Sequence, residues 1–507
     1  MRASVLLAGL ASVAASATKC DPKSFAPYLD SNASIVYART YTSNETFVGP
    51  LANYTGLPDY CAVYVNVSSS ATSSYEFGLW LPTSTWNKRY MAYGNGGFTG
   101  QIAFGDMAPG INYGFAVVST NTGHNSSVTE AGDAGWALNN HDIEYSYYAG
   151  CSTGGRQGLK SVQMFPDDFD GVLAGACAWW TSHQQNWDLK IALDNLPNDA
   201  PGHITADLMD VLADEVMRQC DGVDGVIDKI ILDGYACQFR PEALLCTGTS
   251  SNTSTCFNAA QVDTANRVYG DWIETNQTFL FPSFAWGAEA QVSQMIITAD
   301  DAVDAPSGIA YPRDFVYNDA SWPGDHLDLG TIELSDRLDP GNATADDYDL
   351  RPFQKRGSKL IHYHGFADGE IPTGSSIYYY QQVQKTMMPL GYDLDEFYRF
   401  FLIPGMEHCM DSTHDAPWYI ASANQPSALT GDNVWGVPGF RDRKHDAVLA
   451  LMAWVEKGIA PIELIATQYV DNTPALGVQA QRRTCPYPQH AAYVGGNWNE
   501  TQSFKCV

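Results

Sequence analysis

A serine within a glycine-rich turn is the first residue of this chain that could carry out chemistry. Ser152 lies in the sequence Gly150-Cys151-Ser152-Thr153-Gly154, which fits the Gly-x-Ser-x-Gly pattern of a nucleophile elbow. In such a turn a strand ends sharply and a helix begins, so the serine hydroxyl projects from the sheet. The helix N-terminus favours developing negative charge, and the Thr153 N–H is placed to donate to an oxyanion. The pattern predicts nucleophilic attack by Ser152 on a carbonyl carbon.

A nucleophilic serine needs a histidine to take its proton and a carboxylate to fix the tautomer of that histidine. In α/β-hydrolases the acid and then the histidine follow the serine along the chain. Asp368 follows the apolar run 359–364, and His408 follows the run 397–403. Both would lie at the carboxyl ends of strands, so we predict Asp368 as the acid and His408 as the base. Three alternatives, for which surface positions are the simpler interpretation, are Glu370, His414 and His445.

Cysteines adjoin both the predicted nucleophile and the predicted base. Cys151 precedes Ser152, and Cys409 follows His408. A disulfide between them would hold the two backbones together, with α-carbons about 5.5–6 Å apart. The alternative is that each pairs with another cysteine. In that case it would be chance that both the predicted nucleophile and the predicted base have a cysteine beside them. We therefore predict a Cys151–Cys409 bridge.

The other cysteines indicate an oxidising compartment. The chain has eleven cysteines and no Cys-x-x-Cys spacing typical of zinc sites. Pairs isolated from the rest are expected to form further disulfides: Cys220–Cys237, Cys246–Cys256, Cys485–Cys506 and, at the N-terminus, Cys20–Cys61. Cys177 is left over, and we expect it to be a buried thiol.

Two loops could add a second oxyanion donor and a metal site. The glycine-rich loop 93–100 follows a strand-like run, and the N–H of Gly97, or of Gly96, would be the donor. No Lys-Ser/Thr follows it, which argues against a phosphate-binding loop. The loop 221–230 carries three aspartates among glycines, which suit calcium, although no EF-hand glutamate follows them. An ordinary acidic turn is the alternative for this second loop.

The elements that must position these residues have the pattern of an α/β protein. Short strand-like runs are expected at 77–81, 89–93, 115–120, 145–149, 171–176, 359–364 and 397–403, with helices at 156–165, 375–386 and 445–457. Apolar strands separated by helices predict a mostly parallel sheet covered on both faces. Between about 180 and 355 strand-like runs become rare, and the segment contains four cysteines, three sequons and many Asp, Asn and Gly residues. We predict an α/β-hydrolase fold with a signal peptide at 1–17, a catalytic domain at 18–179 and 356–507, and an inserted lid domain at 180–355.

The N-terminus and the composition predict the location of the protein. A short basic start, an apolar run and a small-x-small site near residue 17 form a secretory signal. No later apolar run is long enough to span a membrane. A net charge of −29 argues against a nucleic-acid partner, because proteins bind the phosphate backbone through Lys and Arg, which acidic residues outnumber here. Nine sequons indicate a secreted glycoprotein: Asn32, Asn44, Asn53, Asn66, Asn125, Asn252, Asn276, Asn342 and Asn499.

With these motifs in place, the sequence resembles the tannase and feruloyl esterase family, and is most similar to its fungal B-type feruloyl esterases. The similarity is carried by residues 147–158 (YYAGCSTGGRQG), 165–171 (FPDDFDG), 395–401 (DEFYRFF) and 485–488 (CPYP), by His408-Cys409 and by the aspartate loop. The resemblance implies Ser152, Asp368 and His408 as the catalytic triad. It also implies a structural calcium held by side chains and carbonyls of Asp221, Asp224, Val226, Asp228 and Ile230.

One segment departs from the family pattern. Family members have a longer stretch before the elbow, including a helix that crosses between strands. Here only residues 121–144 separate the runs 115–120 and 145–149, close to the minimum for a parallel crossover, and they show no helical stripe. A missing stretch, such as a gene-model error, would explain this.

The resemblance implies a secreted serine esterase that releases hydroxycinnamic acids from plant cell-wall polysaccharide, including xylan, through an acyl-enzyme. The expected partner is an aromatic ester, free or linked to polysaccharide, and not nucleic acid or membrane. A tannase acting on gallate esters is the alternative of the same class. A non-catalytic secreted hydrolase fold that binds phenolic or glycan ligands is the alternative of a different class, if the short crossover is real.

Overall fold

A computed structural model of the chain describes residues 20–29, 31–49, 52–68, 74–95, 101–121, 145–247, 254–297, 308–324, 327–431 and 434–507. Several predictions concern residues outside these ranges: the signal peptide at 1–17, Gly97, most of the crossover 121–144, and the sequons at Asn125 and Asn252. Among the described residues, no helix has both the length and the apolar character needed to cross a bilayer.

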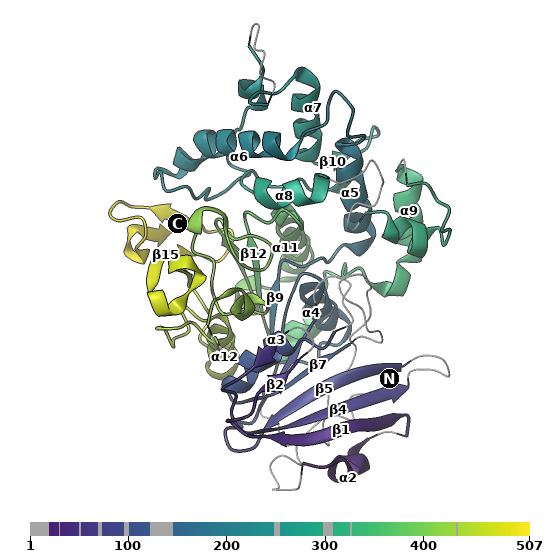
Figure 1. Cartoon of the computed structure of the whole chain (residues 1–507), viewed down its shortest axis with the longest axis vertical. Helices are drawn as coiled ribbons and strands as arrows, with labels where there is room; N and C mark the ends of the chain where they lie inside the picture. The colour runs from purple at the N-terminus through teal and green to yellow at the C-terminus, as the bar shows by residue number, and fades with distance from the viewer. Residues whose placement is uncertain are drawn as a thin grey trace.

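The described residues build one central sheet of nine strands (Figure 1). Across the sheet the strands are β1 (Ala33–Tyr41), β4 (Tyr60–Ser68), β5 (Ser74–Pro82), β7 (Phe115–Thr120), β6 (Arg89–Tyr93), β8 (Tyr145–Cys151), β9 (Gly171–Gly175), β12 (Lys359–Gly365) and β13 (Tyr398–Ile403). From β7 to β13 all neighbours are parallel, whereas β1, β4 and β5 add an antiparallel end. The predicted parallel sheet is thus confirmed, and the strands β1 and β4 are additional to the prediction.

Helices cover both faces of the parallel part, as predicted. On one face α3 (Phe104–Asn112) and α12 (Ala447–Lys457) pack into a core with buried residues of the central strands. On the other face lie α4 (Thr153–Met164), α10 (Arg351–Arg356) and α11 (Thr373–Met387). This arrangement buries both sides of the parallel strands, which explains why their sequences are apolar throughout.

The chain between β9 and β12 forms a mostly helical lobe, drawn at the top of Figure 1. Its elements are α5 (Thr181–Asp194), α6 (Ala206–Cys220), α7 (Ala259–Val268), β10 (Trp272–Ile273), β11 (Phe279–Phe281), α8 (Glu289–Ile296) and α9 (Leu329–Leu338). They share a core of their own that includes Trp187, Leu212 and Phe281. Before β12 the chain returns to the sheet, where Ala345, Leu350 and Phe353 pack in the same core as buried residues of α4 and α11. We call residues 181–338 the helical lobe.

Short elements complete the chain at its two ends. They are α2 (Pro22–Phe25), β2 (Phe47–Val48), β3 (Asn53–Tyr54), the hairpin of β14 (Leu464–Tyr469) and β15 (Val478–Thr484), and the pair β16 (Ala491–Tyr493) and β17 (Phe504–Cys506). All five expected disulfides are present in the structure: Cys20–Cys61, Cys151–Cys409, Cys220–Cys237, Cys246–Cys256 and Cys485–Cys506. Cys177 is a buried free thiol, as expected.

Candidate active site

Ser152 occupies a strained turn between β8 and α4. Its backbone has φ 63° and ψ −125°, a conformation that residues other than glycine rarely adopt. A Cβ on Gly150 would lie 2.6 Å from the Gly154 carbonyl oxygen, so the turn closes only with glycine there. The Ser152 N–H donates to the Gly175 carbonyl at 3.0 Å, which anchors the turn to the end of β9. The local geometry is that of a nucleophile elbow.

Asp368 is fully buried and accepts hydrogen bonds on both carboxylate oxygens. Oδ1 accepts from the backbone N–H groups of Glu370 at 3.0 Å and Ile371 at 2.8 Å. Oδ2 lies 2.8 Å from His408 Nδ1 and 2.9 Å from His364 Nε2. Burial alone would raise the pKa of Asp368, but the two imidazoles hold it well below its usual range. Asp368 is therefore an ionised acceptor.

His408 is hydrogen-bonded to Asp368 through Nδ1, and within the described residues its Nε2 forms no hydrogen bond. Burial would lower the pKa of His408, but the carboxylates of Asp368, Glu370 and Asp188 outweigh burial and raise it. Glu370 Oε2 lies 3.6 Å from Nε2, whereas Asp368 bonds Nδ1. Only a carboxylate on Nδ1 leaves Nε2 free to serve as a base, so the geometry favours Asp368 over Glu370.

The two alternative bases lie in other surroundings. His445 Nδ1 contacts Asp442 at 3.0 Å, next to the start of α12. His414 is exposed and lies in a short turn after the His408 loop. Neither contacts Asp368 among the described residues, so the structure gives no support to these alternatives.

The disulfide Cys151–Cys409 joins the elbow to the loop that carries His408. Its α-carbons are 5.9 Å apart, within the expected range. Cys409 has φ 66°, so the bridge also holds a left-handed backbone position beside the histidine. In the described part of the chain, Ser152 Oγ and His408 share no hydrogen bond, as is common before a substrate tightens such contacts. The bridge keeps the two residues close while that contact is open.

Thr153, one of the two predicted oxyanion donors, lies directly after Ser152 at the start of α4. Thr153 is the first residue of α4, so its N–H has no acceptor within the helix. Gly97 lies outside the described residues. The chain just before it, Gly94-Asn95, packs directly on the elbow, since a Cβ on Gly154 would lie 3.0 Å from the Asn95 carbonyl oxygen.

The helical lobe contributes two residues that the sequence did not reveal. Gln291 of α8 accepts from the N–H of Gly369 at 3.1 Å and from the N–H of His408 at 2.9 Å, so it joins both catalytic loops. Asp188 of α5 is buried close enough to raise the pKa of His408, and no described residue forms a hydrogen bond with its Oδ1. No motif marks either residue, because both act across more than 75 residues of sequence.

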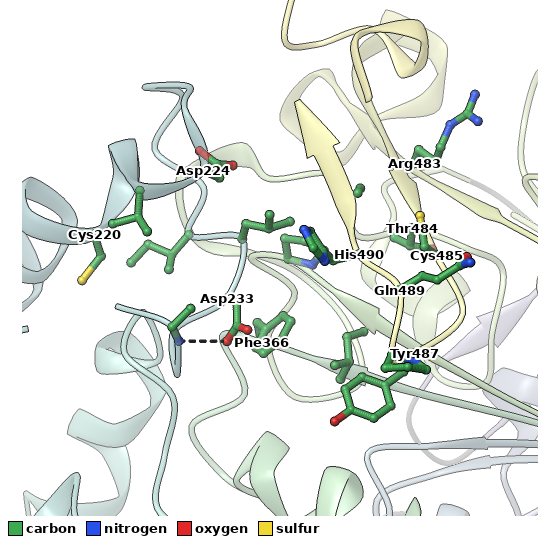
Figure 2. A pocket seen from close by; sticks show the side chains of 18 residues that line it. Cys220, Asp224, Asp233, Phe366, Arg483, Thr484, Cys485, Tyr487, Gln489 and His490 are labelled. Carbon is green, nitrogen blue, oxygen red and sulfur yellow. Dashed lines mark hydrogen bonds between the residues drawn. The ribbon is translucent and has the colours of Figure 1, made fainter. Parts of the chain in front are cut away.

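The aspartate loop lies at the base of the lobe and borders a cavity of about 300 Å³ that also contacts the C-terminal segment (Figure 2). Asp221 Oδ1 accepts from the N–H groups of Asp228 and Lys229 at 3.1 and 2.9 Å. Asp228 also forms a buried ion pair with Arg482. As these side chains stand, no group of three acidic, His or Cys residues in the described ranges is arranged around a common metal position.

Asp224 nevertheless has an unsatisfied oxygen. Its Oδ1 accepts from the Val226 N–H at 3.1 Å, whereas Oδ2 is buried and has no hydrogen-bond partner within the part of the chain that the structure describes. Burial raises the pKa of Asp224 to about 6. A buried carboxylate oxygen of this kind is what a bound cation would satisfy.

The sequence and the structure of this chain were compared with those of known proteins, and both are similar to those of esterases. The family model described as tannase and feruloyl esterase matches residues 61–144 and 137–507. A probable feruloyl esterase B-1 of Neosartorya fischeri is 34% identical over 486 residues, which cover 89% of this chain and 86% of that protein. The crystal structure of feruloyl esterase B from Aspergillus oryzae has a TM-score of 0.81 at 32% identity, and covers 96% of this chain and 99% of that one. A crystal structure of an esterase from Aspergillus oryzae has a TM-score of 0.83 at 30% identity, with coverages of 95% and 98%.

Proposed function

The chain belongs to the tannase and feruloyl esterase family, and from this premise we propose that it is a secreted serine carboxylesterase that hydrolyses feruloyl and related hydroxycinnamoyl esters of plant cell-wall polysaccharides. The observation that carries the proposal is the His408–Asp368 pair on a loop that a disulfide joins to the strained elbow of Ser152. The feruloyl preference is supported by the names of two similar proteins, a probable feruloyl esterase B-1 and a feruloyl esterase B. Five disulfides support the secreted location.

The reaction proceeds in two halves. Ser152 Oγ attacks the ester carbonyl carbon while His408 Nε2 accepts its proton, and the Thr153 N–H donates to the oxyanion. Gly97 is proposed as the second donor. His408 then gives the proton to the leaving sugar alcohol, which leaves a feruloyl ester on Ser152. Water, deprotonated by His408, attacks this acyl-enzyme and releases the free acid.

The helical lobe, residues 181–338, is proposed as a lid; it is shorter than the expected insertion at 180–355, because Ala345, Leu350 and Phe353 pack against the sheet. Gln291 and Asp188 support this role, since both reach the catalytic loops from lobe helices. The substrate would then bind between the lobe and the carboxyl ends of the parallel strands, where ligands of α/β sheets generally bind.

A panel of methyl ferulate, methyl p-coumarate and methyl gallate tests the substrate class. We expect kcat/KM to be highest for one of the two hydroxycinnamates. A preference for gallate would replace the proposal by the tannase alternative. Absence of turnover on all three, together with measurable binding of ferulate, would favour the non-catalytic alternative.

The short crossover is the feature that favours the non-catalytic alternative. Its residues lie mostly outside the described ranges, and the two segments of the family match overlap within it, at 137–144. The strands on either side of it, β7 and β8, both pair with β6 in parallel register. Sequencing transcripts across codons 121–145 decides whether a stretch has been lost from this chain.

We also propose that the aspartate loop binds a structural calcium ion. The side chains of Asp221, Asp224 and Asp228 and the carbonyls of Val226 and Ile230 would hold it, and the unsatisfied Asp224 Oδ2 supports this. The ion would replace the present hydrogen bonds within the loop and stabilise it between α6 and the C-terminal segment. Asp228 would have to share its charge between the ion and Arg482.

Chelation tests the calcium proposal. With a calcium chelator we expect the melting temperature of the wild type to fall, since an ion that binds only the folded state stabilises it. Asp224→Ala should lower the melting temperature in calcium and abolish the response to the chelator, with kcat for methyl ferulate within about threefold at temperatures well below melting. Asp214→Ala, at an exposed position on α6, is the control. A wild type indifferent to chelation contradicts the proposal.

Removing the Cys151–Cys409 bridge should cost more activity than stability. Four other disulfides remain, so the double alanine variant should fold, although a native disulfide typically contributes about 2–4 kcal/mol. A displacement of about 1 Å between nucleophile and base can lower the rate roughly a hundredfold. We expect kcat to fall about tenfold or more, measured well below the melting transition on protein whose fold is verified by circular dichroism.

The matched control is the Cys485→Ala, Cys506→Ala double variant, which removes a disulfide far along the chain from the elbow. It should lose stability but retain kcat. If both double variants kept near wild-type kcat, the Cys151–Cys409 bridge would have no role in positioning.

Glu370 should set the lower pH limit of activity. Its carboxylate lies 3.6 Å from His408 Nε2 and favours the protonated imidazole, which cannot accept the Ser152 proton. Glu370→Gln removes this charge, so the pKa of His408 falls and kcat/KM should begin to rise at a lower pH. The side chain of Glu370 is 48% exposed, and we expect a shift of under about one pH unit. Glu333→Gln, at an exposed site on α9, should leave the pH profile unchanged.

A further inference from the structure

A row of fully buried polar side chains runs from Asp368 into the core of the sheet. His364 Nε2 lies 2.9 Å from Asp368 Oδ2, and His364 Nδ1 lies 2.7 Å from Ser376 Oγ. Ser376 Oγ lies 2.9 Å from His362 Nε2, and His362 Nδ1 lies 2.8 Å from the Tyr398 hydroxyl. Each of these five residues has zero exposure. We call Asp368, His364, Ser376, His362 and Tyr398 the buried array.

The fold explains why these residues meet. His362 and His364 alternate along β12, so both point to the face that α11 covers. Ser376 lies in the first turn of α11 and projects between the two rings. Tyr398 begins β13, the parallel neighbour of β12. The array therefore connects two adjacent strands and a helix to the catalytic acid.

The hydrogen-bond donors and acceptors fix one direction along the array. Asp368 is an ionised acceptor, and the Ile371 carbonyl also lies 3.0 Å from His364 Nε2, so that nitrogen must carry a proton. In the described residues the Tyr398 hydroxyl has a single partner, His362 Nδ1. It donates there, because a buried hydroxyl proton without an acceptor is costly.

With both ends fixed, the middle of the array follows. His362 Nδ1 accepts from Tyr398, so the proton of this neutral ring is on Nε2 and is donated to Ser376 Oγ. Burial keeps the pKa of His362 well below its usual value. The Ser376 hydroxyl must then donate to His364 Nδ1, which makes His364 a neutral ring with its proton on Nε2. Every group of the array is satisfied in this arrangement alone.

We propose that His364 is a positioning residue of the catalytic acid, held in its Nε2–H tautomer by Ser376, and that the buried array keeps Asp368 ionised and oriented toward His408. The backbone N–H groups of Glu370 and Ile371 hold Asp368 Oδ1 in place. His364 holds Asp368 Oδ2, which is also the oxygen that accepts the hydrogen bond from His408 Nδ1. Without His364 the carboxylate is freer to rotate about its Cβ–Cγ bond, and the His408 ring would follow it. The consequence for turnover rests on the esterase function proposed above.

Two neighbouring serines provide the decisive comparison. Ser375 and Ser376 are both fully buried on α11, but Ser375 Oγ has no hydrogen-bond partner among the described residues, whereas Ser376 Oγ contacts both imidazoles. Ser376→Ala should lower kcat for methyl ferulate about three- to tenfold with KM unchanged, because His364 loses the hydrogen bond at Nδ1 that orients its ring, and Asp368 is displaced. Ser375→Ala should keep wild-type kcat. Equal values of kcat in the two variants, lowered or not, would overturn the proposal.

Substitutions of His364 test the donor itself. His364→Leu should lower kcat about 10- to 100-fold with little change in KM, since Asp368 loses one of its two donors on Oδ2. His364→Gln can still donate an amide N–H to Asp368 and should recover part of that loss. Equal kcat in the leucine and glutamine variants, both folded by circular dichroism, would overturn the positioning role.

A measurement without turnover separates this proposal from the proposed function. In protein labelled with ¹⁵N-histidine, the shifts of His362 and His364 should be those of neutral Nε2–H rings between pH 5 and 8. The His362→Gln and His364→Gln variants assign the two signals. A charged ring or an Nδ1–H tautomer at either position would overturn the proposal. If the wild type hydrolysed no ester but the tautomers were as stated, only the proposed function would fail.

Discussion

Ser152→Ala is expected to lower kcat for methyl ferulate about 10⁶-fold and to leave the melting temperature unchanged. Removing a catalytic serine abolishes the acyl-enzyme route, and what remains comes from oxyanion donors and substrate binding. The alanine keeps a Cβ at φ 63°, so the backbone strain of the elbow stays as it is. Burst and steady-state kinetics on a chromogenic ester measure the loss, and thermal unfolding measures the stability.

A second substitution at the same position separates chemistry from strain. Ser152→Gly should be equally inactive, but it should raise the free energy of unfolding by about 1 kcal/mol, because glycine adopts φ 63° without steric cost. The native Ser152 is thus expected to make the fold less stable than glycine at this position would, while providing a nucleophile that projects from the turn. Retention of esterase activity in both variants would show that another residue is the nucleophile.

Asp368→Asn should lower kcat about 10⁴-fold although it changes one atom. The native Oδ2 accepts from His408 Nδ1 and His364 Nε2 at once. An asparagine that keeps its oxygen toward the N–H groups of Glu370 and Ile371 must turn its NH₂ group toward the two imidazoles. His408 then accepts at Nδ1 and carries its proton on Nε2, where it can no longer take the serine proton.

The control for this substitution is Glu370→Gln, which removes the other carboxylate beside the same ring. We expect it to shift the pH profile and to leave the plateau of kcat within about threefold, since a partly exposed ion pair contributes little. If Glu370→Gln lost more activity than Asp368→Asn, the acid would have to be reassigned to Glu370. Both variants should be compared at a pH where the wild type is fully active.

Much of the architecture followed from local sequence patterns. The strand-like runs 89–93 and 115–120 coincide with β6 and β7, and the others overlap their strands, because a strand buried on both faces is apolar throughout. The strands β1 and β4 were missed. β1 has an exposed and half-buried pattern rich in tyrosine, and its place in the sheet comes from pairing with β4 and not from an apolar run.

The sequence by itself determined the residues whose role depends on a short local motif. The strand, glycine turn and helix around Ser152 can be recognised from a dozen consecutive residues. The cysteines beside Ser152 and His408 indicated that these distant residues meet, because a disulfide requires α-carbons about 6 Å apart.

Only the tertiary structure decided the contacts between distant segments. Asp368 and Glu370 are two residues apart, and the sequence favoured Asp368 but left Glu370 open as an alternative, since the choice depends on which ring nitrogen each carboxylate reaches. Gln291 joins the catalytic loops from a lobe helix, and Ser376 links two imidazoles because α11 packs over β12. No periodicity or motif in the sequence predicts such contacts. They arise from the packing of whole elements, which fixes side-chain positions that the local chain leaves open.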